Sequence, residues 1–182
     1  MKLQLRSAVF LAVAILGFWG CEYFPSPPTA PSDPPLSEPG PVIPPTVPSA
    51  IPIADIMSET NNQRRANGLG PLAENSKLNQ AADFKMRDMF ARQYFDHYGP
   101  GQTSGIPELL ERFNYQYVVA GENLALGDFR NANDLIMGWM ASPGHRANLL
   151  NSAYREIGVA TGYDVFQGRR MIIAVQIFGT PR

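Results

Sequence analysis

The sequence contains little cysteine, little histidine and no excess of charge of one sign. Cys21 is the only cysteine among the 182 residues, so no disulfide can form within the chain. After residue 52, Lys and Arg together equal Asp and Glu in number. A strongly basic surface of the kind that collects nucleic acid is therefore absent, and we expect no nucleic-acid partner.

The N-terminus has the composition of an export signal. Lys2 and Arg6 precede an uncharged apolar run of about a dozen residues. This order is typical of a secretory signal peptide, and the run is too short to cross a bilayer comfortably as a helix. We therefore predict that residues 1–20 are a signal peptide.

Cys21 follows directly behind this apolar run. Gly20 and Cys21 resemble the end of a bacterial lipobox, in which the cysteine is lipidated and becomes the mature N-terminus, whereas Phe18 and Trp19 depart from that pattern. Lipid on Cys21 would hold the protein at a membrane surface. The alternatives are an ordinary signal peptide and an uncleaved anchor with a free thiol.

A proline-rich stretch separates this terminus from the rest of the chain. Most of the 17 prolines lie between residues 25 and 52. Proline fixes φ and removes a donor, so the stretch should be extended, at about 3.1 Å per residue. We predict a linker over residues 21–52 that carries a folded domain over residues 53–182. A proline-recognition motif is the alternative.

The folded part begins with helical patterns. A first helix is predicted over residues 55–67, capped by Asp55. A second helix, capped by Asn75 or Ser76, has apolar residues at spacings of three and four. Its predicted buried stripe consists of Leu78, Ala81, Ala82, Met86, Met89 and Phe90.

Further helices are predicted in the middle of the chain. A short helix follows Pro107, which suits a first helical turn. Another begins at Asn131 or Asn133 and ends before Pro143, which starts one more turn through Leu150. The apolar face of the longer helix consists of Ala132, Leu135, Ile136, Trp139 and Met140.

Three segments are rich in β-forming residues. A short strand is predicted over residues 115–119. Residues 157–161 and 171–178 are separated by a stretch containing Gly168, which indicates an antiparallel hairpin with a long loop over residues 162–170. The last strand is apolar almost without interruption, so both of its faces should be covered. We therefore expect helices on both sides of a small sheet.

The two histidines of the chain are its first candidates for chemistry. His97 and His145 each lie where a predicted helix ends and the chain turns. Binding groups are frequently placed on such connections. A surface position or a hydrogen-bonded structural position is the ordinary alternative for each histidine.

Five short motifs, in this order, resemble the CAP superfamily of cysteine-rich secretory, antigen 5 and pathogenesis-related proteins, in its bacterial SCP-like branch. Together they extend over most of residues 56–178. The motifs are NQRRANGL at 62–69 followed by PL at 71–72, YFDH at 94–97, GENLA at 121–125, WMASPGHRANLL at 139–150 and EIGVA at 156–160.

The resemblance implies an α/β fold, specifically an α-β-α sandwich with a small, mainly antiparallel sheet. It also implies a cleft that holds two histidines and two acidic residues. His97, Glu122 and His145 match three of these four positions. Ser142 stands where eukaryotic relatives carry the second acid, and nothing in the sequence places the nearby Glu156 in the cleft.

Two imidazoles and one carboxylate allow three roles. They could bind Zn²⁺ through His97 and His145, with the carboxylate as a third ligand and one open position. They could act as general acid and base. They could also form a buried network that fixes the loops. No nucleophile is evident, because Cys21 lies outside the domain and Ser142 is as well suited to cap the turn at Pro143 as to attack a substrate.

We therefore expect an exported, membrane-tethered CAP-domain protein, found in the cell envelope or secreted. The expected cleft at His97, Glu122, Ser142 and His145 would bind a small hydrophobic molecule, a lipid, a polysaccharide fragment, a metal ion or an envelope protein. The alternative is a metal-dependent hydrolase or peptidase acting in the envelope or outside the cell.

Overall fold

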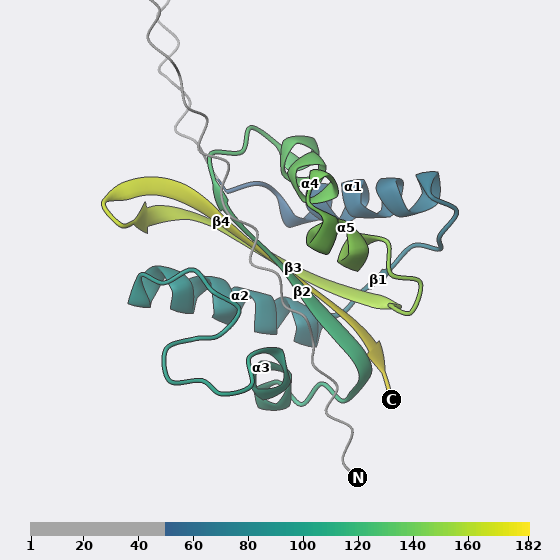
Figure 1. Ribbon diagram of the computed structural model, residues 1–182, viewed down its shortest axis with the longest axis horizontal. Coiled ribbons are helices and arrows are strands. Elements are labelled where there is room, and N and C mark those ends of the chain that lie inside the picture. The colour runs from purple at the N-terminus through teal and green to yellow at the C-terminus, as the bar shows by residue number, and fades with distance from the viewer. Residues whose placement is uncertain (1–49) are drawn as a thin grey trace, which may run out of the picture. The chain divides into compact units, whose positions relative to one another are not determined.

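The computed structural model describes residues 50–182 (Figure 1). The predicted signal peptide, Cys21 and nearly all of the predicted linker lie outside the described residues. The helices and strands are α1 (Ile53–Ala66), β1 (Ala73–Glu74), α2 (Ser76–Arg92), α3 (Ile106–Arg112), β2 (Tyr117–Gly127), α4 (Ala132–Ala141), α5 (Pro143–Leu149), β3 (Glu156–Phe166) and β4 (Arg169–Pro181).

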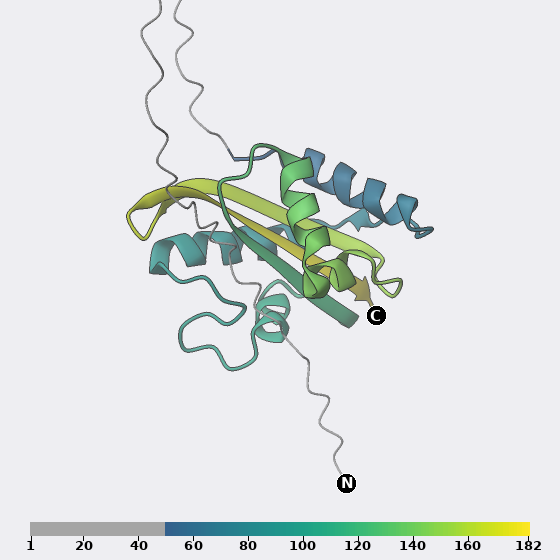
Figure 2. The ribbon, with the colours of Figure 1, turned by 45° about the horizontal axis from the view of Figure 1, so that its top comes forward.

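The described residues form a sheet covered by helices on both faces. The sheet has the strand order β1-β3-β4-β2, and only the short β1–β3 pair is parallel. Helices α1, α4 and α5 cover one face, and α2 and α3 cover the other (Figures 1 and 2). The α/β class and the α-β-α sandwich with a mainly antiparallel sheet are thereby confirmed.

Strand β4 is central to both layers of the core. Its residues from Ile172 to Phe178 are all buried. Ile173, Val175 and Ile177 pack with α2 and α3, whereas Ile172 and Phe178 pack with the opposite helices. The prediction that both faces of this strand are covered is therefore confirmed.

The two most strongly patterned helices form as predicted. The side chain of Asn75 caps α2 by accepting hydrogen bonds from the backbone N–H groups of Lys77 and Leu78. Asn131 caps α4 by accepting from the N–H of Asp134. Every predicted core residue on these helices is buried except Phe90, which is partly exposed and packs against the α2 side of the core.

Two expectations about element ends are corrected. Helix α1 starts after Pro52 without a side-chain cap, so Asp55 lies inside its first turn and is not the cap. Strand β2 runs from Tyr117 to Gly127 and not only over residues 115–119, so it includes Glu122.

The hairpin of β3 and β4 has a tight turn and not the expected long loop. Strand pairing continues to Phe166 and Arg169, which leaves Gln167 and Gly168 as the turn. Both turn residues have positive φ, 48° and 81°, as two-residue hairpin turns with the right twist require. Of the extra strand residues near this end, Asp164, Val165, Arg169 and Arg170 are exposed, whereas Phe166 is buried on the α2 side of the core. The glycine and the charged residues among them interrupt the β-rich pattern in the sequence.

No helix between residues 50 and 182 combines the length and apolar character needed to cross a membrane.

Candidate functional site

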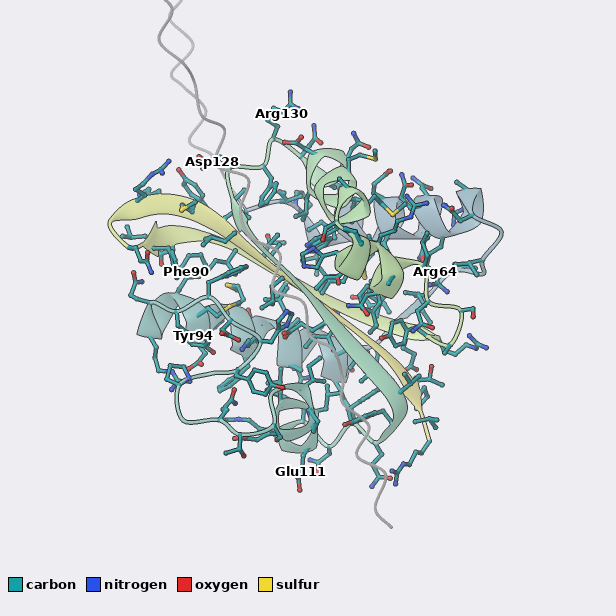
Figure 3. The ribbon with its side chains drawn as sticks, in the orientation of Figure 1. Arg64, Phe90, Tyr94, Glu111, Asp128 and Arg130 are labelled. Atoms are coloured by element: carbon teal, nitrogen blue, oxygen red, sulfur yellow. The ribbon has the colours of Figure 1, made fainter. Side chains whose placement is uncertain are left out.

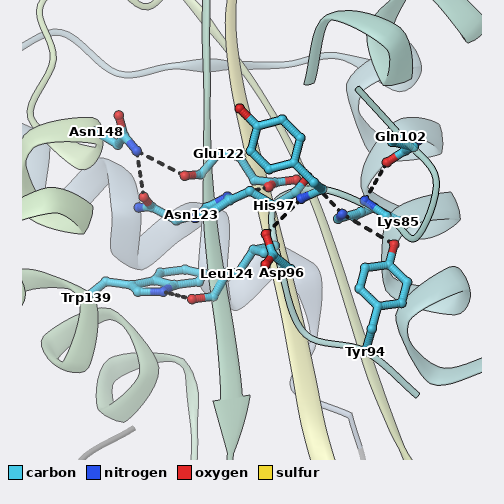
Figure 4. Close-up of polar contacts among 12 residues, drawn as sticks. Lys85, Tyr94, Asp96, His97, Gln102, Glu122, Asn123, Leu124, Trp139 and Asn148 are labelled. Carbon is cyan, nitrogen blue, oxygen red and sulfur yellow. Dashed lines mark hydrogen bonds and ion pairs between the residues drawn. The ribbon is translucent and has the colours of Figure 1, made fainter. Parts of the chain in front are cut away.

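His97 and Glu122 meet in the structure although they are 25 residues apart. Nδ1 of His97 lies 2.7 Å from Oε1 of Glu122 (Figure 4). The His97 side chain is 11% exposed and the Glu122 side chain only 1%. The imidazole therefore lies on the solvent side of the pair, and the carboxylate lies behind it.

The pleat of β2 directs its neighbouring residues to opposite layers. Leu124, two residues after Glu122, packs in the core on the α2 side. Successive side chains of a strand alternate between its faces, so Glu122 shares the α2 side with Leu124. Asn123 points the other way, and its Nδ2 donates to the backbone carbonyl of His145 at 3.2 Å.

Side chains from α4 and α5 protect the outer edge of β2, which is the last strand of the sheet. Nε1 of Trp139 donates to the carbonyl of Leu124 at 3.1 Å. Nδ2 of Asn148 donates to the carbonyl of Glu122 at 3.0 Å and to Oδ1 of Asn123 at 2.9 Å (Figure 4). These bonds satisfy edge carbonyls that would otherwise be open to another strand, and they hold α5 beside Glu122.

His145 lies within α5, the short helix that starts at Pro143 as predicted. The residue is only 7% exposed, and its ring lies 6.3 Å from that of Trp139 between centroids. Burial lowers the pKa of His145 to about 4, and the charge of nearby His97 adds to this effect. His145 is therefore a neutral imidazole at pH 7. Within residues 50–182 no hydrogen bond joins its ring to His97 or Glu122.

Ser142 and Glu156 do not join this pair by hydrogen bonds. Ser142 lies between α4 and α5 and is half-buried, and its hydroxyl makes no capping bond. Its place in a binding site stays a prediction. Oε2 of Glu156 accepts from Tyr115 Oη at 2.8 Å and from Asn75 Nδ2 at 2.9 Å. Glu156 is thus occupied by other partners.

Lys85 is a residue of the site that sequence reasoning missed. It is 4% exposed, and its Nζ donates to the backbone carbonyl of His97 at 3.0 Å and to Oη of Tyr94 at 3.4 Å (Figure 4). Burial lowers the pKa of Lys85, while the negative charge of Glu122 acts in the opposite direction. The available signal was a lysine at a position of the α2 stripe where spacing alone predicts an apolar residue.

One oxygen of Glu122 has no partner. Oε2 is buried and makes no hydrogen bond within the described residues. Buried polar atoms in proteins are nearly always satisfied by protein, water or an ion. Glu122 therefore has one unmet acceptor among the described residues.

The donor set for a metal ion is incomplete. Within residues 50–182 no group of three or more His, Cys, Asp and Glu side chains is placed to hold a metal ion. His97 and His145 are imidazoles in one region, but Glu122 is already bonded to His97. Three protein ligands with an open position, the arrangement of catalytic zinc sites, are not present among these residues.

A separate cavity of about 580 Å³ lies between α2, α3 and the segment that joins them. Its lining includes Asp88 and Arg92 of α2 and Glu111 of α3, the last of which Figure 3 labels. None of His97, Glu122 and His145 lines it. The cavity is therefore distinct from the predicted site.

Comparison with known families and sequences gives three matches. A profile described as the Cysteine-rich secretory protein family (CAP) matches residues 57–178. The chain is 38% identical over 105 residues to the uncharacterized protein YkwD of Bacillus subtilis and 33% identical over 104 residues to the uncharacterized membrane protein YlbC of the same organism. The two alignments with YkwD and YlbC each cover 57% of this chain, but only 40% of the length of YkwD and 30% of the length of YlbC.

Solved structures give the same fold. An extracellular protein containing an SCP domain from Bacillus anthracis superposes with a TM-score of 0.60 at 29% identity, covering 69% of this chain and 39% of that protein. An outer surface protein of Borrelia burgdorferi superposes with a TM-score of 0.63 over 73% of this chain and 98% of that protein. At 20% identity, the second likeness shows the fold alone.

Proposed function

Because this chain belongs to the cysteine-rich secretory protein (CAP) family, in its bacterial form, we propose that it is an exported binding module with its site at His97, Glu122 and His145. The contact of 2.7 Å between His97 and Glu122 is the observation that carries this proposal. It joins two separate motifs of the sequence at a point where an imidazole reaches solvent. Family membership alone is a weaker argument, since one fold can host unlike functions.

The chemistry of the site favours a ligand that donates hydrogen bonds. Nδ1 of His97 faces Glu122, so a neutral His97 ring that donates from Nδ1 leaves Nε2 as an acceptor on the solvent side of the pair. We propose a small hydrophobic molecule, a lipid or a polysaccharide fragment that presents a hydroxyl or amine group. Tyr98, 44% exposed and adjacent to His97 in the chain, offers an aromatic surface to its apolar part.

A divalent metal ion is the second ligand that we propose. His97 directs Nδ1 to a carboxylate, as metal-binding histidines commonly do with the nitrogen that does not hold the metal. His97 Nε2 and the neutral His145 would be the ligands, and bound Zn²⁺ would supply a Lewis acid. The hydrolase or peptidase alternative depends on such an ion. It is less well supported because no group of three His, Cys, Asp or Glu side chains among the described residues is placed to hold the ion.

Export is proposed from two separate observations. The N-terminal residues have the order of a secretory signal followed by Cys21. The relatives named above include an extracellular protein and a membrane protein. We therefore propose a protein lipidated at Cys21 and held at a membrane, where its partners are envelope components.

The test uses the imidazole signals in NMR spectra, which are simple to assign because the chain has only two histidines. ZnCl₂, soluble glycan fragments and a sterol are added separately to the purified protein. We expect at least one of them to shift the His97 signals, and His97→Ala to abolish its binding. Arg146→Ala, an exposed change on α5, is the matched control and should bind normally.

The rival function predicts a different result. Peptides and esters are added to the purified protein with and without a chelator, and their hydrolysis is measured. Turnover that stops with the chelator, and in both His97→Ala and His145→Ala, would replace the binding module by a metal-dependent hydrolase. Unchanged His97 signals with every probe, together with no turnover, would leave the structural role of the pair as the better account.

A further inference from the structure

Lys85 is a buried cation that bonds to the backbone of His97, the partly exposed residue of the proposed site. We propose that Lys85 is a positioning residue: its ammonium group binds the backbone of the segment 94–97 and so holds the His97 imidazole against Glu122. The proposal rests on the proposed function only in treating His97 as a binding group. It goes further by assigning the orientation of that group to a residue on another element.

The geometry shows how a residue inside α2 reaches His97. The chain leaves α2 at Gln93, which has a left-handed φ of 56°, and folds back over the helix. Lys85, about two turns before the helix end, then lies close to both Tyr94 and His97 (Figure 4). Its Nζ donates at 3.0 Å to His97 O and at 3.4 Å to Tyr94 Oη.

Other hydrogen bonds hold the chain that follows α2 at Tyr94, before His97, and at Pro100, after it. Tyr94 Oη donates to Oδ2 of Asp88 at 2.6 Å, and Nη1 of Arg92 donates to the carbonyl of Pro100 at 3.0 Å. Among the described residues, however, Lys85 is the only side chain that bonds to the backbone of His97. Loss of its ammonium group should therefore loosen His97 while the ends of the segment stay attached.

Packing alone does not account for a lysine at this position. The other members of the buried stripe, including Ala82, Met86 and Met89, are apolar. A buried ammonium group is costly unless it is paired and hydrogen-bonded, and a leucine or methionine would fill the same space. The two oxygen acceptors and the nearby charge of Glu122 are the partners that offset this cost.

The test follows the Nδ1–H signal of His97 by NMR in the full chain, without any ligand. In Lys85→Met we expect this proton to exchange with water about tenfold faster, as loss of an anchoring hydrogen bond implies. Lys85→Arg keeps a cationic donor and should restore most of the protection. Lys77→Met is the matched control, because Lys77 is exposed on the same helix and bonds to Asn114 O at 2.8 Å.

The signals of His145 report on the fold in the same spectra. If they are unchanged in Lys85→Met and the His97 proton is equally protected, the proposal is wrong. If Lys85→Met fails to fold, the proposal is tested on the unaltered protein through the NMR signal of the Lys85 ammonium group. A Lys85 ammonium signal with slow exchange and a nuclear Overhauser effect to His97 supports the proposal, and a signal as exposed to water as that of Lys77 overturns it. Because no ligand is used, failure of the proposed function would leave these outcomes unaffected.

Discussion

His97 and His145, the two histidines of the proposed site, lie in contrasting environments. His97 is partly exposed and hydrogen-bonded to a carboxylate. His145 is buried beside Trp139, and only its backbone carbonyl is tied to Asn123. An imidazole that loses water without gaining an acidic partner favours its neutral form. The two histidines are therefore not interchangeable in any binding chemistry.

The burial of His145 predicts a dependence of stability on pH. Its pKa is about 4 in the folded protein, lowered mainly by burial, against an ordinary value of 6.5. The unfolded chain therefore binds the proton more readily between these values. The contribution of neutral His145 to the free energy of unfolding is complete above pH 6.5 and is lost as the pH falls toward 4. The loss is on the order of 2–3 kcal/mol.

Urea unfolding between pH 4 and pH 8 measures this contribution. We expect His145→Gln to reduce the fall in the free energy of unfolding between pH 6.5 and pH 4. His97→Gln should keep most of that fall. An NMR titration in which His145 takes up its proton near pH 6.5 would contradict the prediction.

At the scale of elements, α2 links the core to the site. One end of it packs closely on β3, where Leu78 and Asn79 lie against Gly158. Asn79 Oδ1 accepts from the N–H of Val159 at 2.9 Å, which fixes helix and strand together. Lys85, in the middle of the helix, donates to the backbone carbonyl of His97. The position of His97 therefore depends on the docking of α2 against the sheet.

This close approach predicts a strong effect of adding one methyl group. A Cβ on Gly158 would overlap the backbone of Leu78 and Asn79, which cannot move aside as a flexible side chain can. Gly158→Ala should lower the free energy of unfolding by about 3 kcal/mol.

Circular dichroism during urea unfolding gives the measurement. Gly138→Ala is the matched control, because Gly138 is exposed on α4 and nothing lies within 4 Å of its added Cβ. In Gly138→Ala the free energy of unfolding should rise by up to about 1 kcal/mol, because alanine has a higher helix propensity than glycine. Similar losses in both variants would show that the contact with α2 is not the cause.

A second link between elements comes from the first of the motifs. Arg64 near the end of α1 is buried, and Figure 3 labels it. Its guanidinium donates to the carbonyls of Gly70, Leu149 and Asn151 at 2.9 to 3.0 Å. These bonds tie α1 to the end of α5, so this motif supports the layer that carries His145.

At the scale of the whole molecule, the site lies at an edge of the sheet where the two helical layers come together. Glu122 on β2 faces the α2 layer, while Asn123 beside it is bonded to α5. A ligand at His97 would therefore contact a region to which both layers contribute. The folded domain needs no disulfide to hold these layers, because its core is apolar on both faces of β4.

Attachment to a membrane is the prediction that belongs to the whole chain. If Cys21 is lipidated, Cys21→Ser should release the protein from the membrane fraction or block its processing. Fractionation of cells and the mass of the mature protein provide the measurement. A Ser26→Ala variant in the same region serves as the control. Unchanged retention and mass in Cys21→Ser would rule out lipid at this position.

The sequence by itself determined the elements whose patterns are local. The spacing of apolar residues in α2 and α4, their asparagine caps and the continuous apolar run of β4 were sufficient, because helix and strand periodicity repeat within a few residues. The five motifs also identified the family, which the profile match over residues 57–178 confirms. The turn at Gln167 and Gly168 was missed because Gly162, Asp164 and the arginines at 169 and 170 interrupt the apolar runs of the two strands.

Only the tertiary structure decided how the site is assembled. Family resemblance implied only a common cleft for His97 and Glu122, and the fold brings their side chains into contact. The burial of His145 and the role of Lys85 depend on which elements pack around them, and no local pattern contains that information. Periodicity shows which face of an element is buried, but the partners of a buried polar group come from chain segments that are distant in sequence.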